Sequence, residues 1–583
     1  MINAINLIWG NCKKGMILIL FMFPLKILLP FISLQVFQFI LNSIQNKSIN
    51  NLIWILSGYF LLLVSEKFTN EGFNYILSYI KLKITNDLNI KLINKVINLE
   101  LCDFENSSTY NKIHESLRDI NTPFEAFNIL IELIDGLFGL LISCYILVSW
   151  DRSSLLFLSI APLISFYFTI KIGKFEFLKL QERVPIVRKI SYLKDLLINA
   201  MSSKENKILG VENYFKDIFV KEYDDFLDKD KKTLWFQFIN GIIFQFVSVM
   251  VAVIIIFKVI DSVISGLILF GTANTLIACI WNVTKYSEKI SLNTAKLYTK
   301  KNYLKNMEIF LDHNSESLCK SSEDAGIDIK DIDTIEFINV SFKYKENLDY
   351  VLKNVSFKIE KGDKVVIVGQ NGSGKSTILK LILGIYEKYD GDILINGISL
   401  RKINKYRFYE KIGVIFQNFT KYELKIMEFL KLSNLNIQDD DVLKNLNIFE
   451  SNNLLNFLLE KDIENLQLGN RFENGIDLSG GEWQQLVFCR TLMKKNMSLL
   501  VLDEPNSGLD VFSEKKIYKI LDEQLTNDVT KILVTHRLHL LDIDDYRIIY
   551  IENGVVCEDD TSKVLLSKNT KLKKFYKSSI LGL

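Results

Sequence analysis

A glycine-rich turn in the second half of the chain has the side chains and the spacing needed to bind phosphate. Residues 369–377 follow the apolar run 364–368 and fit the pattern G-x-x-x-x-G-K-S/T between a buried strand and a helix. Backbone N–H groups of such a loop wrap the phosphates, and the helix offers its positive N-terminal end. We expect Lys375 to reach the β- and γ-phosphates and Ser376 to hold Mg²⁺. The residues predicted to bind the nucleotide here are Gly369, Asn371, Gly372, Ser373, Gly374, Lys375, Ser376 and Thr377.

A second motif places two carboxylates at the end of an apolar strand. Residues 499–502 are three leucines and a valine, and Asp503 and Glu504 follow them directly. Asp503 is positioned to act on Mg²⁺, and Glu504 to orient or deprotonate the attacking water. Two acids after an apolar strand are common by themselves. Together with the phosphate loop they indicate a nucleotide triphosphatase.

A block of small residues before that strand resembles the signature of a known family. Residues 478–482 read Leu-Ser-Gly-Gly-Glu, which is similar to the LSGGQ signature of the ATP-binding cassette (ABC) superfamily, with Glu482 where glutamine is usual. A serine and two glycines that open a helix form another anion cradle. The resemblance implies that Ser479, Gly480 and Gly481 close on ATP bound to the opposite subunit.

Four single residues complete the resemblance in the order and spacing of the superfamily. It implies that Gln417 senses Mg²⁺ and the membrane domain, that His536 contacts the γ-phosphate, and that Tyr344 stacks on adenine. Asp510 matches the D-loop of the cassette. Each residue alone is more often an ordinary core or polar residue, so the assignment depends on the whole set. The implied catalytic residues are Glu504, His536 and Gln417, and the implied metal ligands are Ser376, Gln417 and Asp503.

The elements that position these residues can be predicted in outline from the composition. It indicates that part of the chain lies in a membrane and part faces water. The 583 residues are 49% hydrophobic, yet 24% of them are charged. Crossing about 30 Å of hydrocarbon takes about 20 apolar residues. Five windows are of this kind, and a shorter sixth is counted because the spans pair as hairpins. The six predicted spans are 16–41, 52–64, 126–150, 154–172, 235–260 and 264–281.

The connections between the spans predict their orientation. Short turns lie around Asn46, Asp151 and Asp261, while the segments between the hairpins are long and rich in Lys and Arg. The positive-inside rule places the long segments and both termini in the cytoplasm. Apolar residues at helical spacing also indicate that the second span continues as a rod beyond the membrane. They are Ile80, Ile84, Leu88, Leu92 and Val96.

The predicted architecture has two domains. Residues 1–312 form an all-α domain of six transmembrane helices, similar to type IV exporters, and residues 313–333 form a linker. Residues 334–583 form an α/β P-loop ATPase domain with an α-helical subdomain. The net charge of +2 gives no electrostatic argument for a nucleic-acid partner. Seven scattered cysteines and only four histidines favour neither a disulfide framework nor a zinc site.

Six spans ahead of one cassette resemble the half-transporter layout of ABC exporters. This implies an ATP hydrolase in the cell membrane that moves a substrate out of the cytoplasm by alternating access. Because all motifs of the ATP site are present, we expect a homodimer, with a heterodimer as the lesser alternative. Residues 473–475 and 478–484, with segments 104–110 and 204–210, resemble the branch that exports lantibiotics and other ribosomally made peptides. The chain begins almost at its first span, so the peptide is expected to leave with its leader uncut. The alternatives are a lipid or multidrug exporter and a membrane-anchored ATPase that transports nothing.

Three charged residues interrupt the predicted spans, where each costs about 2.5–3.5 kcal/mol on insertion scales. Lys26 lies in the first span, and Glu132 and Asp135 lie about one helical turn apart in the third, at a matching depth. We expect Lys26 to pair with one of the acids beside the substrate pathway, and Asn274 of the sixth span to extend that surface. The alternative is that these side chains snorkel to the cytoplasmic interface.

Overall fold

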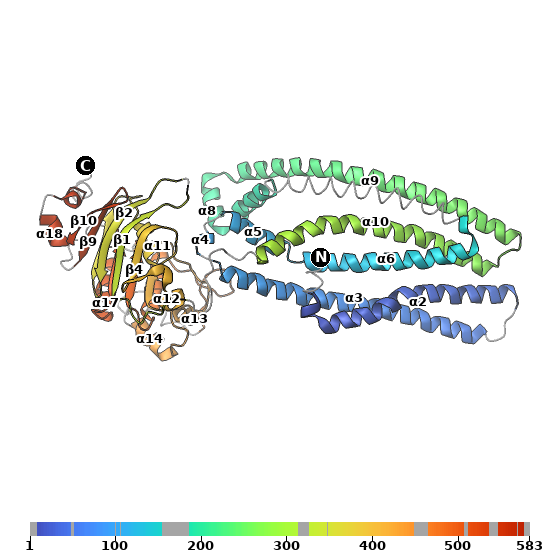
Figure 1. The fold of residues 1–583 in the computed structure, drawn as a ribbon, viewed down its shortest axis with the longest axis horizontal. Coiled ribbons are helices and arrows are strands. Elements are labelled where there is room, and N and C mark those ends of the chain that lie inside the picture. The colour runs from blue at the N-terminus through green and yellow to red at the C-terminus, as the bar shows by residue number, and fades with distance from the viewer. Residues whose placement is uncertain are drawn as a thin grey trace. The chain divides into compact units, whose positions relative to one another are not determined.

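The chain forms two compact units in a computed structural model (Figure 1). The structure describes residues 8–47, 52–99, 101–104, 107–153, 186–312, 326–346, 348–447, 465–505, 511–535, 546–567 and 570–575. One unit comprises residues 1–98 with 107–315, and the other comprises residues 99–106 with 316–583. The first unit is helical, and the second contains two β-sheets.

Long helices build the first unit, which we call the membrane unit. Helix α10 packs against α6, α2 and α9, and α2 packs against α3, so that the rods of this unit lie side by side (Figure 1). Their bounds are α2 (Lys13–Gln45), α3 (Leu52–Ile97), α5 (Ser107–Arg118), α6 (Thr122–Trp150), α8 (Ala200–Leu209), α9 (Glu212–Ile264) and α10 (Phe270–Asp312). The short helix α4 (Leu101–Phe104) belongs to the second unit.

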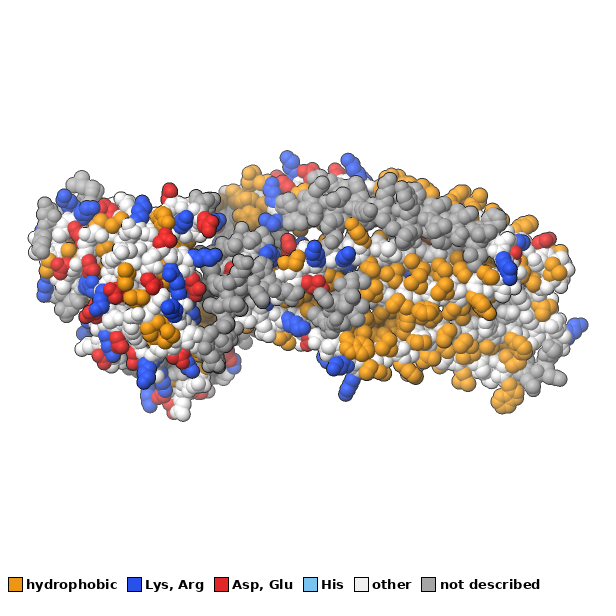
Figure 2. All heavy atoms as spheres, viewed as in Figure 1, with side chains coloured by type: hydrophobic (Ala, Val, Ile, Leu, Met, Phe, Trp, Pro, Cys, Tyr) orange, Lys and Arg blue, Asp and Glu red, His pale blue; other side chains and the backbone are white. Residues whose placement is uncertain are grey.

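Three of the described helices, α2, α6 and α9, are long and apolar enough to cross a membrane. They contain the predicted spans 16–41, 126–150 and 235–260, and hydrophobic side chains cover much of the visible face of this unit (Figure 2). The predicted span 52–64 begins α3, which continues to Ile97. The predicted span 154–172 lies outside the described residues.

The turn between the last two predicted spans differs from the sequence prediction. Asp261 lies inside α9, and the turn occupies residues 265–269. Gly266 ends the helix, because it has a φ of +75° and its N–H donates to the carbonyl of Val263 at 3.0 Å. The N–H of Leu267 then donates to the carbonyl of Ser262 at 3.0 Å, which completes a Schellman cap. The last predicted span, 264–281, therefore starts as a helix only at Phe270.

The rod predicted to follow the second span is present in α3. Ile80, Ile84 and Leu88 are fully buried, and Leu92 is almost so. They pack in one hydrophobic cluster with Phe73 of the same helix and with residues of α2, α6 and α10. Spacing of i, i+4 puts these side chains on one face of a helix, so the pattern indicated both the helix and its buried side.

The second unit, which we call the cassette, contains a four-stranded sheet with the order β2-β1-β4-β5 and a six-stranded sheet with the order β10-β9-β3-β8-β7-β6. Strands β6, β7, β8, β3 and β9 pair in parallel with one another, and β10 pairs with β9 in the antiparallel direction. The strands are β1 (Thr334–Phe342), β2 (Leu352–Glu360), β3 (Lys364–Gly369), β4 (Asp390–Ile395), β5 (Ile398–Ser399), β6 (Ile412–Ile415), β7 (Leu499–Asp503), β8 (Thr530–Val534), β9 (Arg547–Glu552) and β10 (Val555–Thr561). The helices are α11 (Lys375–Ile382), α12 (Lys405–Glu410), α13 (Ile426–Lys431), α14 (Asp439–Asn447), α16 (Gly480–Leu492), α17 (Val511–Gln524) and α18 (Ser562–Ser567), with a 3₁₀ turn at Leu400–Lys402.

Strand β3 joins two hydrophobic cores. Val365 and Ile367 pack into one core, and Val366 and Val368 pack into the other, as the period of two in a strand requires. Strands of a parallel sheet covered on both faces are continuous apolar runs, which is the pattern of 364–368. This confirms the predicted α/β domain with helical parts.

Residues 326–333, which were expected to belong to the linker, pack against the cassette. Ile329 and Ile332 are buried in one of its cores, and the carbonyl of Ile327 accepts the N–H of Asn404 at 3.0 Å. The apolar residues that alternate with the acids explain this packing. The domain boundaries drawn from the sequence stay a prediction.

Candidate nucleotide site

The carboxyl ends of neighbouring parallel strands gather most of the predicted site on one edge of the larger sheet. The phosphate loop follows β3, Asp503 ends β7, and Gln417 follows β6. Strand β8 lies between β3 and β7 in the same sheet. Ligands of open α/β sheets bind outside the carboxyl ends of the strands, so this edge is where a nucleotide belongs.

The phosphate loop has the backbone of an anion cradle. Gly374 has a φ of +105°, and a Cβ there would lie 2.6 Å from the side chain of Leu352, so glycine is required on both grounds. Helix α11 begins at the next residue, and the N–H groups of its first turn have no partner within the helix. Asn371 and Gly372 are exposed at the tip of the loop.

Two buried side chains of the loop are suited to a bound phosphate. Lys375 is 5% exposed, and its Nζ donates to the carbonyls of Gly369 and Gln370 at 2.9 Å each. Ser373 is also 5% exposed, and its Oγ has no hydrogen-bond partner among the described residues. Buried polar atoms normally have a partner, and a phosphate oxygen would supply one.

Burial also shifts the pKa values of two charged groups in this site. It lowers the pKa of the Lys375 ammonium, against the opposing attraction of Glu504 and Asp503. Burial raises the pKa of the Asp503 carboxyl, and the neighbouring charge of Glu504 raises it further. Both shifts reflect a site where charges leave water before a ligand neutralises them.

The oxygen atoms needed for a hard cation lie beside the loop. Ser376 Oγ lies 3.5 Å from Asp503 Oδ1, and Gln417 Nε2 donates to Glu504 Oε2 at 3.0 Å. A hydroxyl, a carboxylate and an amide oxygen fit Mg²⁺, which usually takes one or two protein ligands and completes its shell with phosphate and water. Glu504 has a φ of +42°, an unusual backbone conformation of the kind that clusters at functional sites.

The predicted adenine contact, Tyr344, lies close to the loop. Its hydroxyl is 2.9 Å from Thr377 Oγ1 on α11, and 39% of the residue is exposed. Thr377 itself is buried. The ring is therefore anchored at its hydroxyl end while part of its surface stays open to a ligand.

The signature residues begin α16. Ser479 Oγ accepts the N–H of Glu482 at 3.3 Å, and Glu482 Oε2 accepts the N–H of Ser479 at 2.7 Å, which makes a capping box. This gives a physical role to the glutamate that stands where glutamine is usual. Gly480 and Gly481 form the first turn of the helix. Among the described residues, no hydrogen bond joins Ser479, Gly480 or Gly481 to the phosphate loop of the same chain.

Two residues of the predicted site, Asp510 and His536, lie outside the described residues. Strand β8 ends at Val534, two residues before His536, on the same edge of the sheet as the other motifs. Their roles stay predictions.

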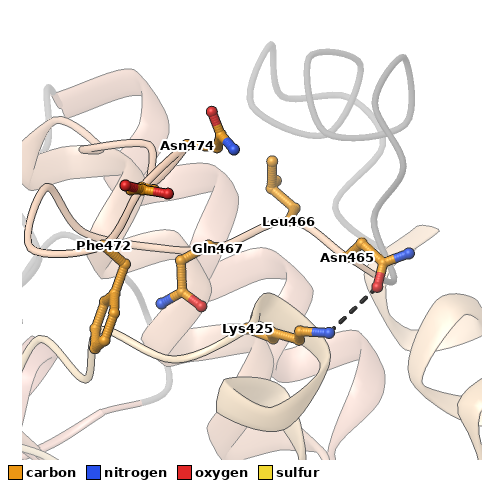
Figure 3. Close-up of a pocket in the computed structure, with 7 residues that line it drawn as sticks. Lys425, Asn465, Leu466, Gln467, Phe472 and Asn474 are labelled. Carbon is orange, nitrogen blue, oxygen red and sulfur yellow. Dashed lines mark hydrogen bonds between the residues drawn. The ribbon is translucent and has the colours of Figure 1, made fainter.

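A cavity of about 560 Å³ lies beside the start of α13, and it is separate from these motifs. Lys425 Nζ donates to Asn465 Oδ1 at 3.2 Å on its wall (Figure 3). The other lining residues are Leu466, Gln467, Phe472, Glu473 and Asn474. None of the predicted nucleotide-binding residues lines this cavity.

In the membrane unit, the acids of α6 have different partners from the predicted one. Asp135 Oδ2 accepts from Lys289 Nζ of α10 at 2.6 Å, and Glu132 Oε2 accepts from Asn293 Nδ2 at 3.0 Å. Lys26 Nζ instead lies 4.3 Å from the centre of the Phe73 ring. The predicted pairing of Lys26 with one of these acids was wrong, because α10 packs against α6 and offers closer donors.

The two donors on α10 were missed in the sequence. Lys289 and Asn293 are four residues apart, as Glu132 and Asp135 are three apart, so each pair occupies one face of its helix. That matching spacing was the available signal. Asn274 is exposed near the start of α10, about 23 Å along the helix from Lys289.

Comparisons with known proteins find a matching family, relatives of similar length and a solved structure with the same fold. A family model described as ABC transporter matches residues 352–507. The chain is 30% identical over 586 aligned positions to the nisin transport ATP-binding protein of Lactococcus lactis subsp. lactis, covering 99% of this chain and 95% of that protein. It is 30% identical over 564 positions to the subtilin transport ATP-binding protein of Bacillus subtilis, covering 94% and 89%. A solved structure of a bacterial Atm1-family ABC exporter with ATP bound superposes with a TM-score of 0.80 at 17% identity, covering 98% of this chain and 99% of that one. At that identity the likeness concerns the fold.

Proposed function

Because the chain belongs to the ABC transporter family, we propose that it exports a ribosomally made peptide of the lantibiotic kind. The protein is a membrane-embedded ABC exporter that binds ATP and couples its hydrolysis to transport. The observation that supports the peptide substrate is the match over nearly the full length to transporters of nisin and subtilin. Such a match includes the membrane unit, where the substrate is recognised.

In the proposed ATP site, the residues of this chain divide the work between binding and hydrolysis. Lys375 and the loop backbone bind the phosphates, and Ser373 Oγ, which has no hydrogen-bond partner among the described residues, lies in the same cradle. Ser376, Asp503 and Gln417 would hold Mg²⁺, which would neutralise charge on the phosphate oxygens. Glu504 accepts a proton from the attacking water, and His536 contacts the γ-phosphate.

The proposed active assembly is a homodimer. Ser479, Gly480 and Gly481 start a helix of 13 residues and have no described hydrogen bond to their own phosphate loop. A second copy could bring its signature helix to the ATP held by the first, with the positive helix end toward the phosphates. Each chain carries a complete set of motifs, so both sites of the dimer would hydrolyse ATP.

The proposed location is the bacterial cytoplasmic membrane, with both termini in the cytoplasm. The support is the distribution of Lys and Arg, which crowd the long connections and are rare in the short turns. The cassette then lies where ATP is available, and transport is outward.

The test uses the full-length protein in liposomes with its cassettes facing outward. ATP and a fluorescent precursor peptide of the nisin type are added outside, and both ATP hydrolysis and peptide accumulation in the lumen are measured. We expect peptide to stimulate hydrolysis and to accumulate only with ATP, while the Glu504→Gln variant in the same orientation accumulates none. Fluorescent lipid and a cationic dye are run in parallel. Transport of lipid or dye without peptide would replace the proposal by a lipid or multidrug exporter, and transport of none with intact ATPase would make it a membrane-anchored ATPase.

A further inference from the structure

A second tyrosine packs against the proposed adenine contact. Tyr386 follows α11 by four residues, and its ring centre lies 5.5 Å from that of Tyr344 with the planes at 84°. Phe342 lies 5.1 Å from Tyr344 at 80°, and 5.0 Å from Tyr386 at 51°. The three rings form a compact cluster that we call the aromatic brace.

The perpendicular contacts leave the ring of Tyr344 available. Aromatic pairs prefer edge-to-face or offset arrangements, and here neither neighbour is stacked parallel to Tyr344. The residue remains 39% exposed. Its aromatic neighbours therefore hold the tilt of the ring without being stacked parallel on it.

Helix α11 holds the same ring from two further points. Thr377 Oγ1 is 2.9 Å from the Tyr344 hydroxyl. Lys380 Nζ lies 5.6 Å from the centre of the Tyr344 ring and 5.9 Å from that of Tyr386, within range of a cation–π attraction to both. The brace thus joins the aromatic residue on the β1 side to the helix that begins at the phosphate loop.

We propose that Tyr386 is a positioning residue for the nucleotide: it holds the Tyr344 ring at the tilt that adenine stacking requires, and so tunes the affinity for the base. The inference rests on the proposed role of Tyr344. A residue that acts in this way changes binding of the base but not of the phosphates, and it acts only while Tyr344 is present.

The experiment measures binding of ADP and of inorganic pyrophosphate to the purified full-length protein by titration calorimetry. Tyr386→Ala should weaken ADP by about three- to tenfold, the effect expected for losing one edge-to-face ring pair, and should leave pyrophosphate within a factor of two. Tyr386→Phe keeps the ring and should bind ADP like the parent. Tyr406→Ala removes an exposed tyrosine on α12 and serves as the matched control.

A double-mutant cycle separates this inference from the assignment on which it rests. Tyr344→Ala should weaken ADP by itself, and adding Tyr386→Ala to it should change little more, since coupled residues are not additive. If Tyr344→Ala binds ADP normally, the adenine assignment is wrong. If Tyr344→Ala weakens ADP but Tyr386→Ala alone does not, only the brace is wrong. Equal loss of ADP and pyrophosphate, additive losses in the cycle, or the same loss in Tyr386→Phe would each overturn the positioning role.

Discussion

The two units hold their ionisable side chains in opposite ways. In the cassette, Asp503 and Glu504 stand at the end of a strand beside Lys375, and burial perturbs the pKa of Lys375 and of Asp503. In the membrane unit, Asp135 is paired with Lys289, and Glu132 is hydrogen-bonded to Asn293. In the cassette these charged groups surround the proposed place of a ligand, whereas the acids of α6 have their partners on α10.

This difference follows from the surroundings. A charge in hydrocarbon is costly, so charged side chains there face the bundle interior and pair with one another. At about 1.5 Å per residue, Asp135 lies about 23 Å along α6 from Trp150, near the far side of a 30 Å layer. At the sheet edge of the cassette, Lys375, Asp503 and Glu504 contact neighbouring groups of the cassette, and a bound nucleotide would add its phosphate oxygens to these contacts.

The largest effect is expected from a substitution that removes the proposed general base of the cassette and leaves ATP binding intact. Glu504→Gln keeps the hydrogen-bonding shape of the side chain but removes the base for the attacking water. General-base contributions are about 10²–10⁴-fold, so turnover should fall by at least about 100-fold while ATP still binds. ATPase assays with nucleotide-binding titrations check this, and Glu523→Gln on the exposed face of α17 is the control. Hydrolysis near the parent rate would mean that Glu504 is not the base.

A smaller effect is expected from the residue that binds phosphate. Lys375→Ala removes a buried ammonium whose hydrogen bonds to a charged group are each worth about 1.5–3 kcal/mol, so ATP should bind about ten- to a hundredfold more weakly. Lys353→Ala, at an exposed position on β2, should bind ATP normally. Equilibrium binding of ATP at low temperature distinguishes the two variants. Unchanged affinity in Lys375→Ala would contradict the phosphate-loop assignment.

The sequence predicted the cassette residue by residue because each motif is local. A strand, a glycine-rich loop and a helix start lie within 14 residues at 364–377, so the positions of Lys375 and Ser376 follow from neighbours along the chain. The strand order then brings Asp503 and Gln417 to the same edge without further information. The capping box of Glu482 could also have been predicted, since Ser-x-x-Glu is a local sequence pattern.

The membrane unit was predictable only in part, because contacts between its helices are not local in the sequence. Hydropathy located α2, α6 and α9, and helical spacing located the buried face of α3. Depth along a helix does not say which neighbour a side chain meets. Lys26 and Lys289 both lie at a depth from which a lysine could pair with Asp135. Asp135 pairs with Lys289 because α10 packs against α6. The spacing of Lys289 and Asn293 was a signal in the sequence, but one sequence does not say that α10 packs against α6.

A moderate effect is expected from breaking the ion pair between α6 and α10. Its side chains are 15% and 29% exposed, so removing either partner should leave a poorly solvated charge and cost about 1–3 kcal/mol, less than for a fully buried pair. Asp135→Leu and Lys289→Met should each lower the thermal midpoint of the protein in detergent, and the double variant should recover most of the loss. Additive losses would contradict the pairing.

Lys26 provides the matched comparison in the same unit. It contacts the Phe73 ring, and no ion pair of Lys26 is present among the described residues. Lys26→Ala should therefore change stability less than Lys289→Met. Under the proposed pathway role it should alter peptide-stimulated ATPase while basal ATPase survives. If peptide stimulation and transport stay unchanged in Lys26→Ala, Glu132→Gln and Asp135→Asn, these residues do not line the pathway.

The smallest expected effect concerns the glutamate of the signature. Glu482→Gln keeps a side-chain oxygen that can accept the N–H of Ser479, so the capping box survives and only the charge at the helix start is lost. That charge is worth about 0.3–1 kcal/mol near a helix N-terminus. Glu482→Ala loses the box as well and should cost about 1 kcal/mol more, as cap substitutions do. Thermal unfolding and ATPase assays of both variants measure this. Glutamine should support ATPase close to the parent rate, because the N-terminus of α16 keeps its shape; a large loss of ATPase in Glu482→Gln with unchanged stability would instead give the carboxylate a role in the reaction.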